Sequence, residues 1–131
     1  MAKRKGDPAE ELWARACEIK ALFERFDAEA GDSGVADLAA RICHELRVRL
    51  RQEEEVFGPE DAEPEEFEDL LVRVEGQAGG DELSIGMARL SEAFEARQDA
   101  MGERLGEAAR ARGPELMRRL EVIRQDMALG D

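Results

Sequence analysis

The chain has 131 residues, which is enough for one domain with a single core and too short for two comfortable ones. Hydrophobic residues make up 43% and charged residues 39%, and the 32 acidic residues outnumber the 19 basic ones, giving a net charge of -13. A field of this sign repels phosphate backbones, so we expect no nucleic-acid partner. No apolar run approaches the length of a transmembrane helix, so we expect no membrane partner either.

The termini and the cysteines bear on the compartment. The basic start, Met1–Asp7, has no apolar segment behind it and is therefore not typical of a signal peptide. The two cysteines, Cys17 and Cys43, are too few for a disulfide scaffold and suit a reducing compartment. The sequence predicts a cytoplasmic protein with a single domain over residues 1–131, in which residues 1–6 form a frayed terminus.

The first predicted helix begins at Asp7-Pro8. Asp7 can cap the first turn, Pro8 needs no amide donor there, and Glu10 falls at the capping-box position. The helix is expected to run to about Ala30 and to end at Gly31. One face carries apolar residues at intervals of three or four: Leu12, Ala16, Ile19, Phe23 and Phe26.

Glycine and proline also delimit the second and third predicted helices. The second runs from about Gly34 to just before Gly58-Pro59, and the third, which is short, runs from about Pro64 to Gly76. The apolar stripe of the second consists of Leu38, Ile42, Leu46 and Val56. The stripe of the third consists of Phe67, Leu70, Leu71 and Val74.

A fourth helix is expected to open at residues 79–81, with Asp81 as its cap, and a fifth to open at Gly113-Pro114. Gly102 and Gly106 weaken the fourth helix by roughly 1 kcal/mol each relative to alanine. Its stripe consists of Leu83, Met87, Leu90, Phe94, Met101 and Leu105. The stripe of the fifth consists of Leu116, Leu120, Ile123 and Met127, and we expect this helix to pack across an end or a groove of the others.

The fold class follows from this row of helices. No segment shows the alternation of a strand, β-branched residues are few and tyrosine is absent. Amphipathic helices joined by short loops favour an all-α fold, namely an up-and-down four-helix bundle with an additional C-terminal helix.

Two charged residues fall within an apolar stripe. On a helical wheel, Arg49 and Glu53 lie in the middle of the second helix's stripe, between Leu46 and Val56, and their spacing of four lets the side chains meet. Either the stripe opens to solvent here and both side chains reach water, or they form an ion pair inside the bundle. On the first helix, the small Ala16 lies at the centre of the facing stripe, where it leaves space for a large polar neighbour.

Several segments in order resemble one known family. Residues 42–59, ICHELRVRLRQEEEVFGP, look like the second helix of hemerythrin-like (HHE cation-binding) domains, which carries His-x-x-x-Glu-Glu and ends at a Phe-Pro-like corner. Residues 18–26 are similar to the family's first helix, and residues 69–76 followed by 80–83 to the end of its third helix and the next loop. The resemblance spans roughly Leu12 to Leu120 and implies a four-helix bundle that holds two irons between histidines and bridging carboxylates.

The sequence departs from the family at the positions that hold the metals. The family's first-helix histidine matches Ala16, and its second-helix histidine matches Arg49, so that only the partner Glu53 of that helix remains. The third-helix histidine falls near Pro64, where the chain also looks shortened. By this resemblance, Glu53 is the one residual metal ligand.

The fourth helix offers no ligand either. Its histidine and carboxylate match Ala96 and Ala100, or Arg97 and Met101 if the register is shifted by one residue. The single histidine of the chain, His44, falls on the polar side of the second helix and matches no ligand position.

We therefore expect a hemerythrin-like fold that has lost its di-iron site, with no cofactor and no enzymatic activity. In the lost site Arg49 supplies positive charge beside Glu53, and in the shifted register Arg97 adds a second cation. Such a protein acts by binding, as a regulatory or interaction protein with a protein partner or with itself. The alternative is an atypical iron- or oxygen-binding protein that uses residual carboxylates around Glu53. A third hypothesis is an oligomerisation partner that assembles through the fifth helix, Leu116–Met127.

Overall fold

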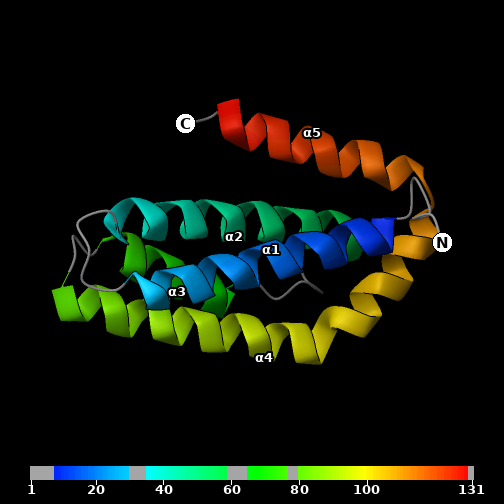
Figure 1. Ribbon diagram of the computed structural model, residues 1–131. Helices are drawn as coiled ribbons and strands as arrows, with labels where there is room; N and C mark the ends of the chain where they lie inside the picture. The colour runs from blue at the N-terminus through cyan, green and yellow to red at the C-terminus, as the bar shows by residue number, and fades with distance from the viewer. Residues whose placement is uncertain (1–7, 30–34, 59–64, 77–79, 130–131) are drawn as a thin grey trace.

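The computed structural model describes residues 8–29, 35–58, 65–76 and 80–129. These residues form five helices, as predicted, and contain no strand (Figure 1). The helices are α1 (Pro8–Ala28), α2 (Val35–Phe57), α3 (Glu65–Glu75), α4 (Gly80–Arg112) and α5 (Glu115–Leu129). Seven residues expected at helix boundaries lie outside the described residues: Asp7, Ala30, Gly31, Gly34, Pro59, Pro64 and Gly79.

Two glycines end helices where the sequence predicts an end. Gly58 follows α2 with φ 93° and donates its amide to the carbonyl of Glu54 at 2.8 Å. Gly113 follows α4 with φ 78° and donates to the carbonyl of Arg110 at 3.1 Å. Only glycine adopts this left-handed conformation without a steric penalty, so each position stops its helix and turns the chain.

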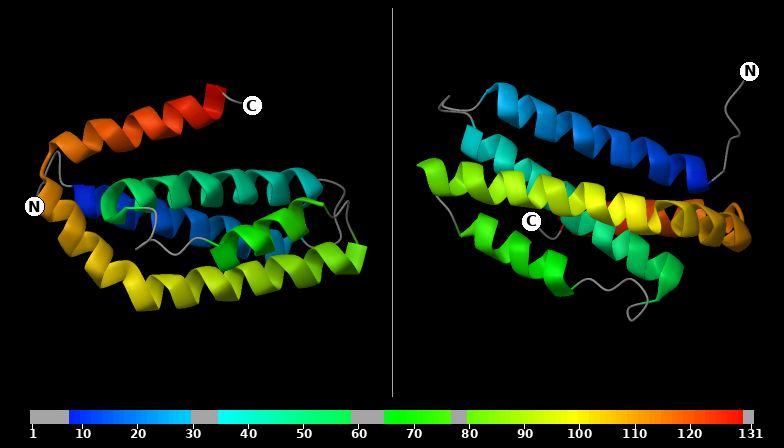
Figure 2. Two further views of the ribbon diagram at one scale, coloured as in Figure 1. Left: turned by 180° about the vertical axis from the view of Figure 1, so that it is seen from behind. Right: turned by 90° about the horizontal axis from the view of Figure 1, so that it is seen from below.

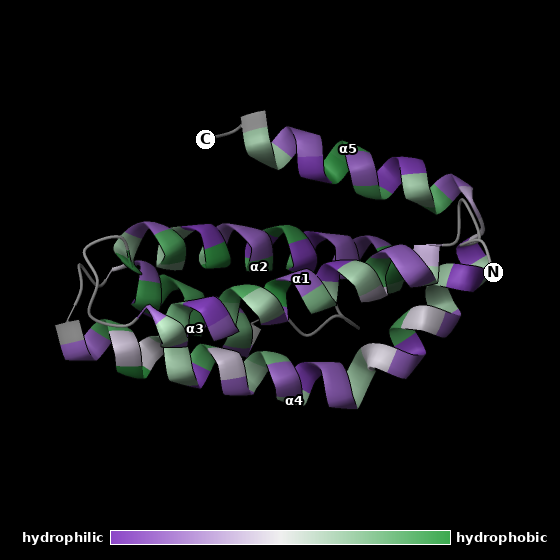
Figure 3. Ribbon diagram, viewed as in Figure 1, coloured by the Kyte–Doolittle hydropathy of each residue, from purple (hydrophilic) through white to green (hydrophobic). Residues whose placement is uncertain are grey.

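Helices α1 to α4 form a bundle in which the chain direction alternates from one helix to the next (Figures 1 and 2). Contacts join α1 to α2 and α4, α3 to α2 and α4, and α2 to α4. Hydrophobic and hydrophilic residues alternate along the helices in the manner of amphipathic helices (Figure 3). Within the described ranges, no helix combines the length and the apolarity that a membrane span needs.

The core consists of two apolar clusters. The larger, which we call the upper cluster, includes Ile19, Ile42, Leu71 and Leu90, and is contributed by α1, α2, α3 and α4. The smaller, the lower cluster, contains Leu12, Leu105, Ala109, Leu116 and Leu120, with Val56 and Phe57 packed against it. The predicted stripes of the first and fourth helices are buried throughout. Four other stripe residues are only partly buried: Val56, Leu70, Ile123 and Met127.

The second half of α4 bends, in the part that contains Gly102 and Gly106 (Figure 1). A Cβ at Gly106 would lie 3.9 Å from that of Ala9, so α1 and this part of α4 approach closely. Glycine lowers the stiffness of a helix, and pairs of glycines are common at bends. The bend places Leu105 and Ala109 in the lower cluster.

Helix α5 lies lengthwise along α2, and it also contacts α1 and α4 (Figure 2). Of the two expected placements, α5 does not cross an end of the bundle, whereas contact with both α2 and α1 agrees with packing over a groove. Its first half carries the apolar residues Leu116 and Leu120, which are 1% and 2% exposed and complete the lower cluster. This half of the stripe is used inside the molecule, which leaves only Ile123 and Met127 of the stripe partly exposed.

Ion pairs join α5 and the C-terminal end of α4 to the surface of α2. Glu55 accepts hydrogen bonds from Arg112 Nη2 at 3.0 Å and from Arg119 Nη2 at 3.1 Å, and Arg124 Nη2 lies 3.0 Å from Glu45. The hydrogen bonds from Arg112 and Arg119 lower the pKa of Glu55 below its ordinary value of 4.5.

This lowered pKa predicts an acid-sensitive contribution to stability. Glu55 stabilises the fold fully above the unfolded pKa near 4.5, and the contribution is lost as the pH falls through the lower folded pKa. Because the pair is partly solvated, Glu55→Gln is expected to cost below about 1 kcal/mol at neutral pH. Urea unfolding measures the free energy of unfolding of both proteins at neutral pH and at a series of pH values below 4.5. The difference between variant and wild type should disappear as the pH falls. Glu121→Gln, at an exposed position of α5, is the control. An effect of Glu55→Gln that does not change with pH would contradict the prediction.

Candidate functional site

Among the described residues, three polar side chains are buried, and all three come from one stretch of α2. Arg49, Gln52 and Glu53 are 4%, 3% and 1% exposed. The hypothesis that the stripe opens to solvent at Arg49 and Glu53 is therefore wrong. The two residues lie inside, as the helical wheel places them, and their spacing of four along the helix brings the side chains together.

Arg49 links three helices through its guanidinium. Its Nε donates to Glu53 Oε2 at 3.1 Å within α2, and its Nη1 donates to the backbone carbonyl of Leu12 in α1 at 2.6 Å. Its Nη2 donates to Gln98 Oε1 in α4 at 3.2 Å. The planar, forked guanidinium suits this role because it presents donors in several directions at once.

The second oxygen of Glu53 is bound from the opposite side. Arg97 Nε, on α4, donates to Glu53 Oε1 at 2.7 Å, and its side chain is 11% exposed. The guanidinium carbon of Arg97 lies 5.9 Å from the ring centroid of Phe67 on α3, within the range of a cation–π contact. One carboxylate is thus held between two guanidinium groups, and we call Arg49, Glu53 and Arg97 the Arg–Glu–Arg cluster.

Burial dominates the electrostatics of Arg49. Desolvation penalises its charged form and lowers the pKa of the guanidinium, and the positive charge of Arg97 acts in the same direction. The charge and the hydrogen bond of Glu53 oppose this shift. Glu53 is therefore the group that keeps a charged arginine compatible with the interior.

The Arg–Glu–Arg cluster lies near the junction of the two apolar clusters. On α2 it lies between Leu46 of the upper cluster and Val56, which packs on the lower one. On α4, Arg97 lies between Phe94 of the upper cluster and Leu105 of the lower cluster. Leu50, between Arg49 and Glu53, belongs to the upper cluster, so the ionic groups border that cluster directly.

The structure distinguishes between the two registers of the fourth helix. Arg97 and Met101 point inward, since Arg97 binds Glu53 and Met101 is 8% exposed. Ala96 and Ala100 lie on the surface of α4.

The remaining candidate positions are less informative. Ala16 is buried in the upper cluster, one turn after Leu12, whose carbonyl receives Arg49. Pro64 lies outside the described residues. His44 is half-buried on α2.

Two glutamines that the sequence analysis did not single out complete the polar interior. Gln98 accepts from Arg49, and Gln52 Nε2 donates to the carbonyl of Leu120 in α5 at 3.2 Å. Gln52 lies three residues after Arg49, so it shares a helix face with it, and this spacing is the signal that could have revealed it. No pattern along α4 marks Gln98, because its partner is 49 residues away in the sequence.

This arrangement does not fit a di-iron centre. Both oxygens of Glu53 are occupied by positively charged donors, so a divalent cation there would lie against two like charges. A di-iron site needs imidazole and carboxylate ligands from several helices. Nowhere in the described part of the chain do three or more His, Cys, Asp or Glu side chains gather in a way that could hold a metal ion.

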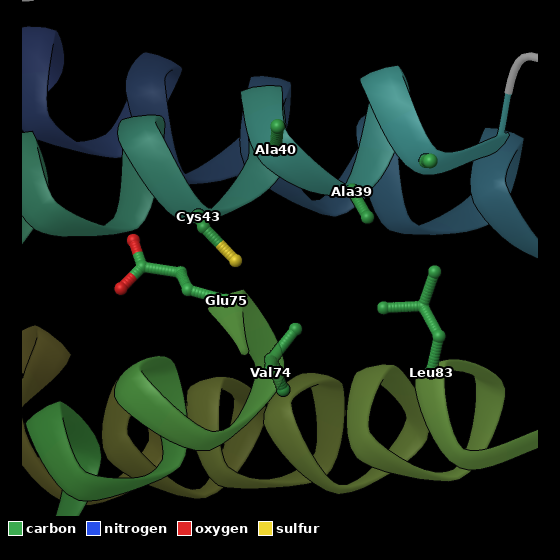
Figure 4. Close-up of a pocket in the computed structure, with 7 residues that line it drawn as sticks. Ala39, Ala40, Cys43, Val74, Glu75 and Leu83 are labelled. Atoms are coloured by element: carbon green, nitrogen blue, oxygen red, sulfur yellow. The ribbon is translucent and has the colours of Figure 1, made fainter. Parts of the chain in front are cut away.

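A small pocket of about 250 Å³ lies beside the upper cluster, between α2, α3 and the start of α4 (Figure 4). Cys43 projects into it from α2, near Glu75. Burial, aided by the negative charge of Glu75, raises the pKa of the thiol to about 11. A thiol that stays protonated at neutral pH is a weak nucleophile, so this pocket offers no reactive cysteine.

No protein-family model, curated protein or solved structure matches the chain. The likeness to hemerythrin-like domains therefore depends on the sequence segments quoted above, and it stays a prediction.

Proposed function

We propose that the protein is a hemerythrin-like bundle that has lost its di-iron site and works as a non-enzymatic binding or regulatory protein. The observation that carries this proposal is the double occupation of Glu53, whose two oxygens accept from Arg49 at 3.1 Å and from Arg97 at 2.7 Å. The alternating directions of α1 to α4 agree with the bundle that the resemblance implies.

The energetics of the interior support the absence of a metal. A buried carboxylate needs a compensating cation, because an isolated charge in a low-dielectric interior costs several kcal/mol or more, by a rough solvation estimate. In a metal protein the ion supplies this charge. Here two guanidinium groups supply it from α2 and α4, and Arg49 adds a hydrogen bond to α1.

The same chemistry favours binding over catalysis. Arginine remains protonated at neutral pH and acts neither as a nucleophile nor as a general base. Glu53 is enclosed, at 1% exposed, so a substrate has no direct access to its carboxylate. The groups gathered in the interior therefore hold helices together and offer no catalytic group to a substrate.

Metal analysis tests this function. Protein purified from iron-supplemented cultures is expected to contain far less than one metal ion per chain, and Fe(II) loading in air should produce no visible charge-transfer band. A chelator should leave the melting temperature unchanged, because the cluster needs no ion. Stoichiometric iron with a visible band would overturn the proposal and favour the alternative, an atypical iron- or oxygen-binding protein that uses Glu53.

A further inference from the structure

Two adjoining hollows of about 310 and 380 Å³ form one groove between the first turns of α1 and the bent second half of α4. The two hollows share five residues: Ala9, Trp13, Gly102, Glu103 and Gly106. Along α4 the lining extends from Asp99 to Arg110, which corresponds to about 16 Å of helix, or about three turns. We call this feature the Trp13 groove, and its length suits a short segment of chain better than a compact small molecule.

The floor of the Trp13 groove is apolar and open. Trp13 is 70% exposed, the largest exposed fraction among the large hydrophobic side chains that the structure describes. Gly102 and Gly106 line the groove on the α4 side, where they add no side chain that would fill it. An exposed indole beside a glycine-lined helix offers a large aromatic surface, and aromatic residues are enriched where proteins bind their partners.

The rim of the groove is acidic. Four exposed carboxylates line it: Glu10, Asp99, Glu103 and Glu107. In the part of the chain that the structure describes, none of the four forms an ion pair or accepts a side-chain hydrogen bond. The fold therefore leaves these charges available to a partner.

Two arginines also line the groove, and they do not reverse its sign. Arg49 is 4% exposed, and its guanidinium donates inside the protein to Glu53, to the carbonyl of Leu12 and to Gln98. Arg110 is exposed at the rim. Counting both arginines in full still leaves the four carboxylates in excess, so the groove is negative.

We infer that the Trp13 groove binds a basic amphipathic helix of a partner protein. The apolar face of that helix packs on Trp13 and on the glycines of α4, and its Lys or Arg side chains reach the carboxylates of the rim. The inference rests on the proposed function, because it gives the chemistry of a partner for a protein that works by binding.

Charge and shape select this partner over other occupants. The chain carries a net charge of -13, so a second copy of it or an acidic peptide would be repelled. A compact cation would meet the carboxylates but leave most of the apolar floor in water. A helix of about three turns covers the floor with one face and places its basic residues on either side of that face.

A designed peptide probes the groove in the whole protein. The probe is a capped peptide of about 14 residues, made of leucine and lysine with leucine at the spacing of one helix face. Trp13 is the single tryptophan of a chain without tyrosine, so its fluorescence reports on the groove. The peptide is expected to shift the emission to shorter wavelength in a saturable way, because the indole leaves water. A scrambled peptide of the same composition, and spermine, which has charge without an apolar face, should bind much more weakly.

Three substitutions test the contacts, and calorimetry measures the affinity of each variant for the peptide. Trp13→Ala should weaken binding at least about tenfold, as loss of an aromatic anchor from an interface does. Glu103→Gln should weaken it about threefold, as loss of one partly solvated ion pair predicts. Glu24→Gln removes the same charge from an exposed position of α1 outside the groove and is expected to leave the affinity unchanged.

A fourth variant fills the floor of the groove. Gly102→Leu has room for its Cβ, since the nearest atom would be Gln98 Oε1 at 4.0 Å, and leucine favours a helix more than glycine does. This variant is expected to keep or raise the melting temperature and to lose the peptide.

The inference fails if the amphipathic peptide does not bind, if the scrambled peptide or spermine binds as well, or if Glu103→Gln and Glu24→Gln behave alike. A shift of the Trp13 emission with protein concentration alone would assign the groove to a second copy and would also overturn it. Failure of the proposed function is distinct from these outcomes, because it is read from the metal content of the same preparation.

Discussion

Glu53→Gln is expected to lower the free energy of unfolding by about 3–5 kcal/mol, the usual cost of removing one partner from a buried ion pair. The substitution keeps the shape of the side chain and removes its charge, so Arg49 and Arg97 remain in the interior beside a neutral amide. This loss is a large share of the roughly 5–15 kcal/mol by which typical domains are stable. Urea unfolding followed by circular dichroism measures it.

The adjacent residue provides a matched control. Glu54 is 21% exposed at its side chain and lies 3.9 Å from Arg51, which is itself 62% exposed, so Glu54→Gln is expected to cost below about 1 kcal/mol. Equal losses of unfolding free energy in the two variants would mean that the buried ion pairs stabilise the fold no more than an exposed pair does.

A triple variant separates the cost of unpaired charge from loss of packing. Arg49→Met, Glu53→Leu and Arg97→Met together replace the cluster with apolar side chains of similar size, and such replacements are often neutral or stabilising. We expect the triple variant to be more stable than Glu53→Gln. If it is equally unstable, the cluster contributes through shape and its hydrogen bonds to Leu12 and Gln98, and not through charge balance.

The helices could be predicted from the sequence because local rules decide them. Glycines end α2 and α4, and every residue of the predicted apolar stripes of α1 and α4 is buried, although the stripes leave out the buried Ala9 and Ala109. The same spacing overstates burial at Val56 on α2 and at Ile123 and Met127 on α5, which are only partly buried. Periodicity specifies which face is apolar, but the length over which a neighbour covers that face is a tertiary property.

Among the polar residues of the interior, the sequence identified mainly those on α2, the helix that contributes most of them. Arg49 and Glu53 stand out on α2 because they interrupt one stripe at a spacing of four, and this is a local signal. The sequence offered Arg97 only in one of two possible alignments of the fourth helix, and it gave no sign of Gln98. Both residues reach the interior because of the rotation of α4 about its axis, and this rotation depends on packing between distant segments. The placement of α5 stayed open between an end and a groove for the same reason, since nothing in its stripe says which helix it covers.

Leu120→Ala is expected to cost about 2–5 kcal/mol, the range for removing a large side chain from a packed core. Leu120 is 2% exposed in the lower cluster, where it meets residues from α1 and α4, and its own carbonyl receives Gln52 from α2. In this structure the first half of α5 is part of the folded core, so its buried apolar residues are not available for contacts with a second chain. Chemical unfolding of the variant measures the loss.

Val122→Ala, on the same helix, is the control for helix propensity and chain composition. Val122 is 46% exposed, so its truncation should change the free energy of unfolding by no more than about 0.5 kcal/mol. A large loss at Leu120 with a small loss at Val122 would place the stabilising face of α5 against the bundle. The short helix α3 contributes no residue to the lower cluster, and α5 supplies the apolar side chains that complete it. Equal, small losses would mean that α5 separates from the bundle in solution, and the apolar residues Leu116 and Leu120 would then be available to a second chain.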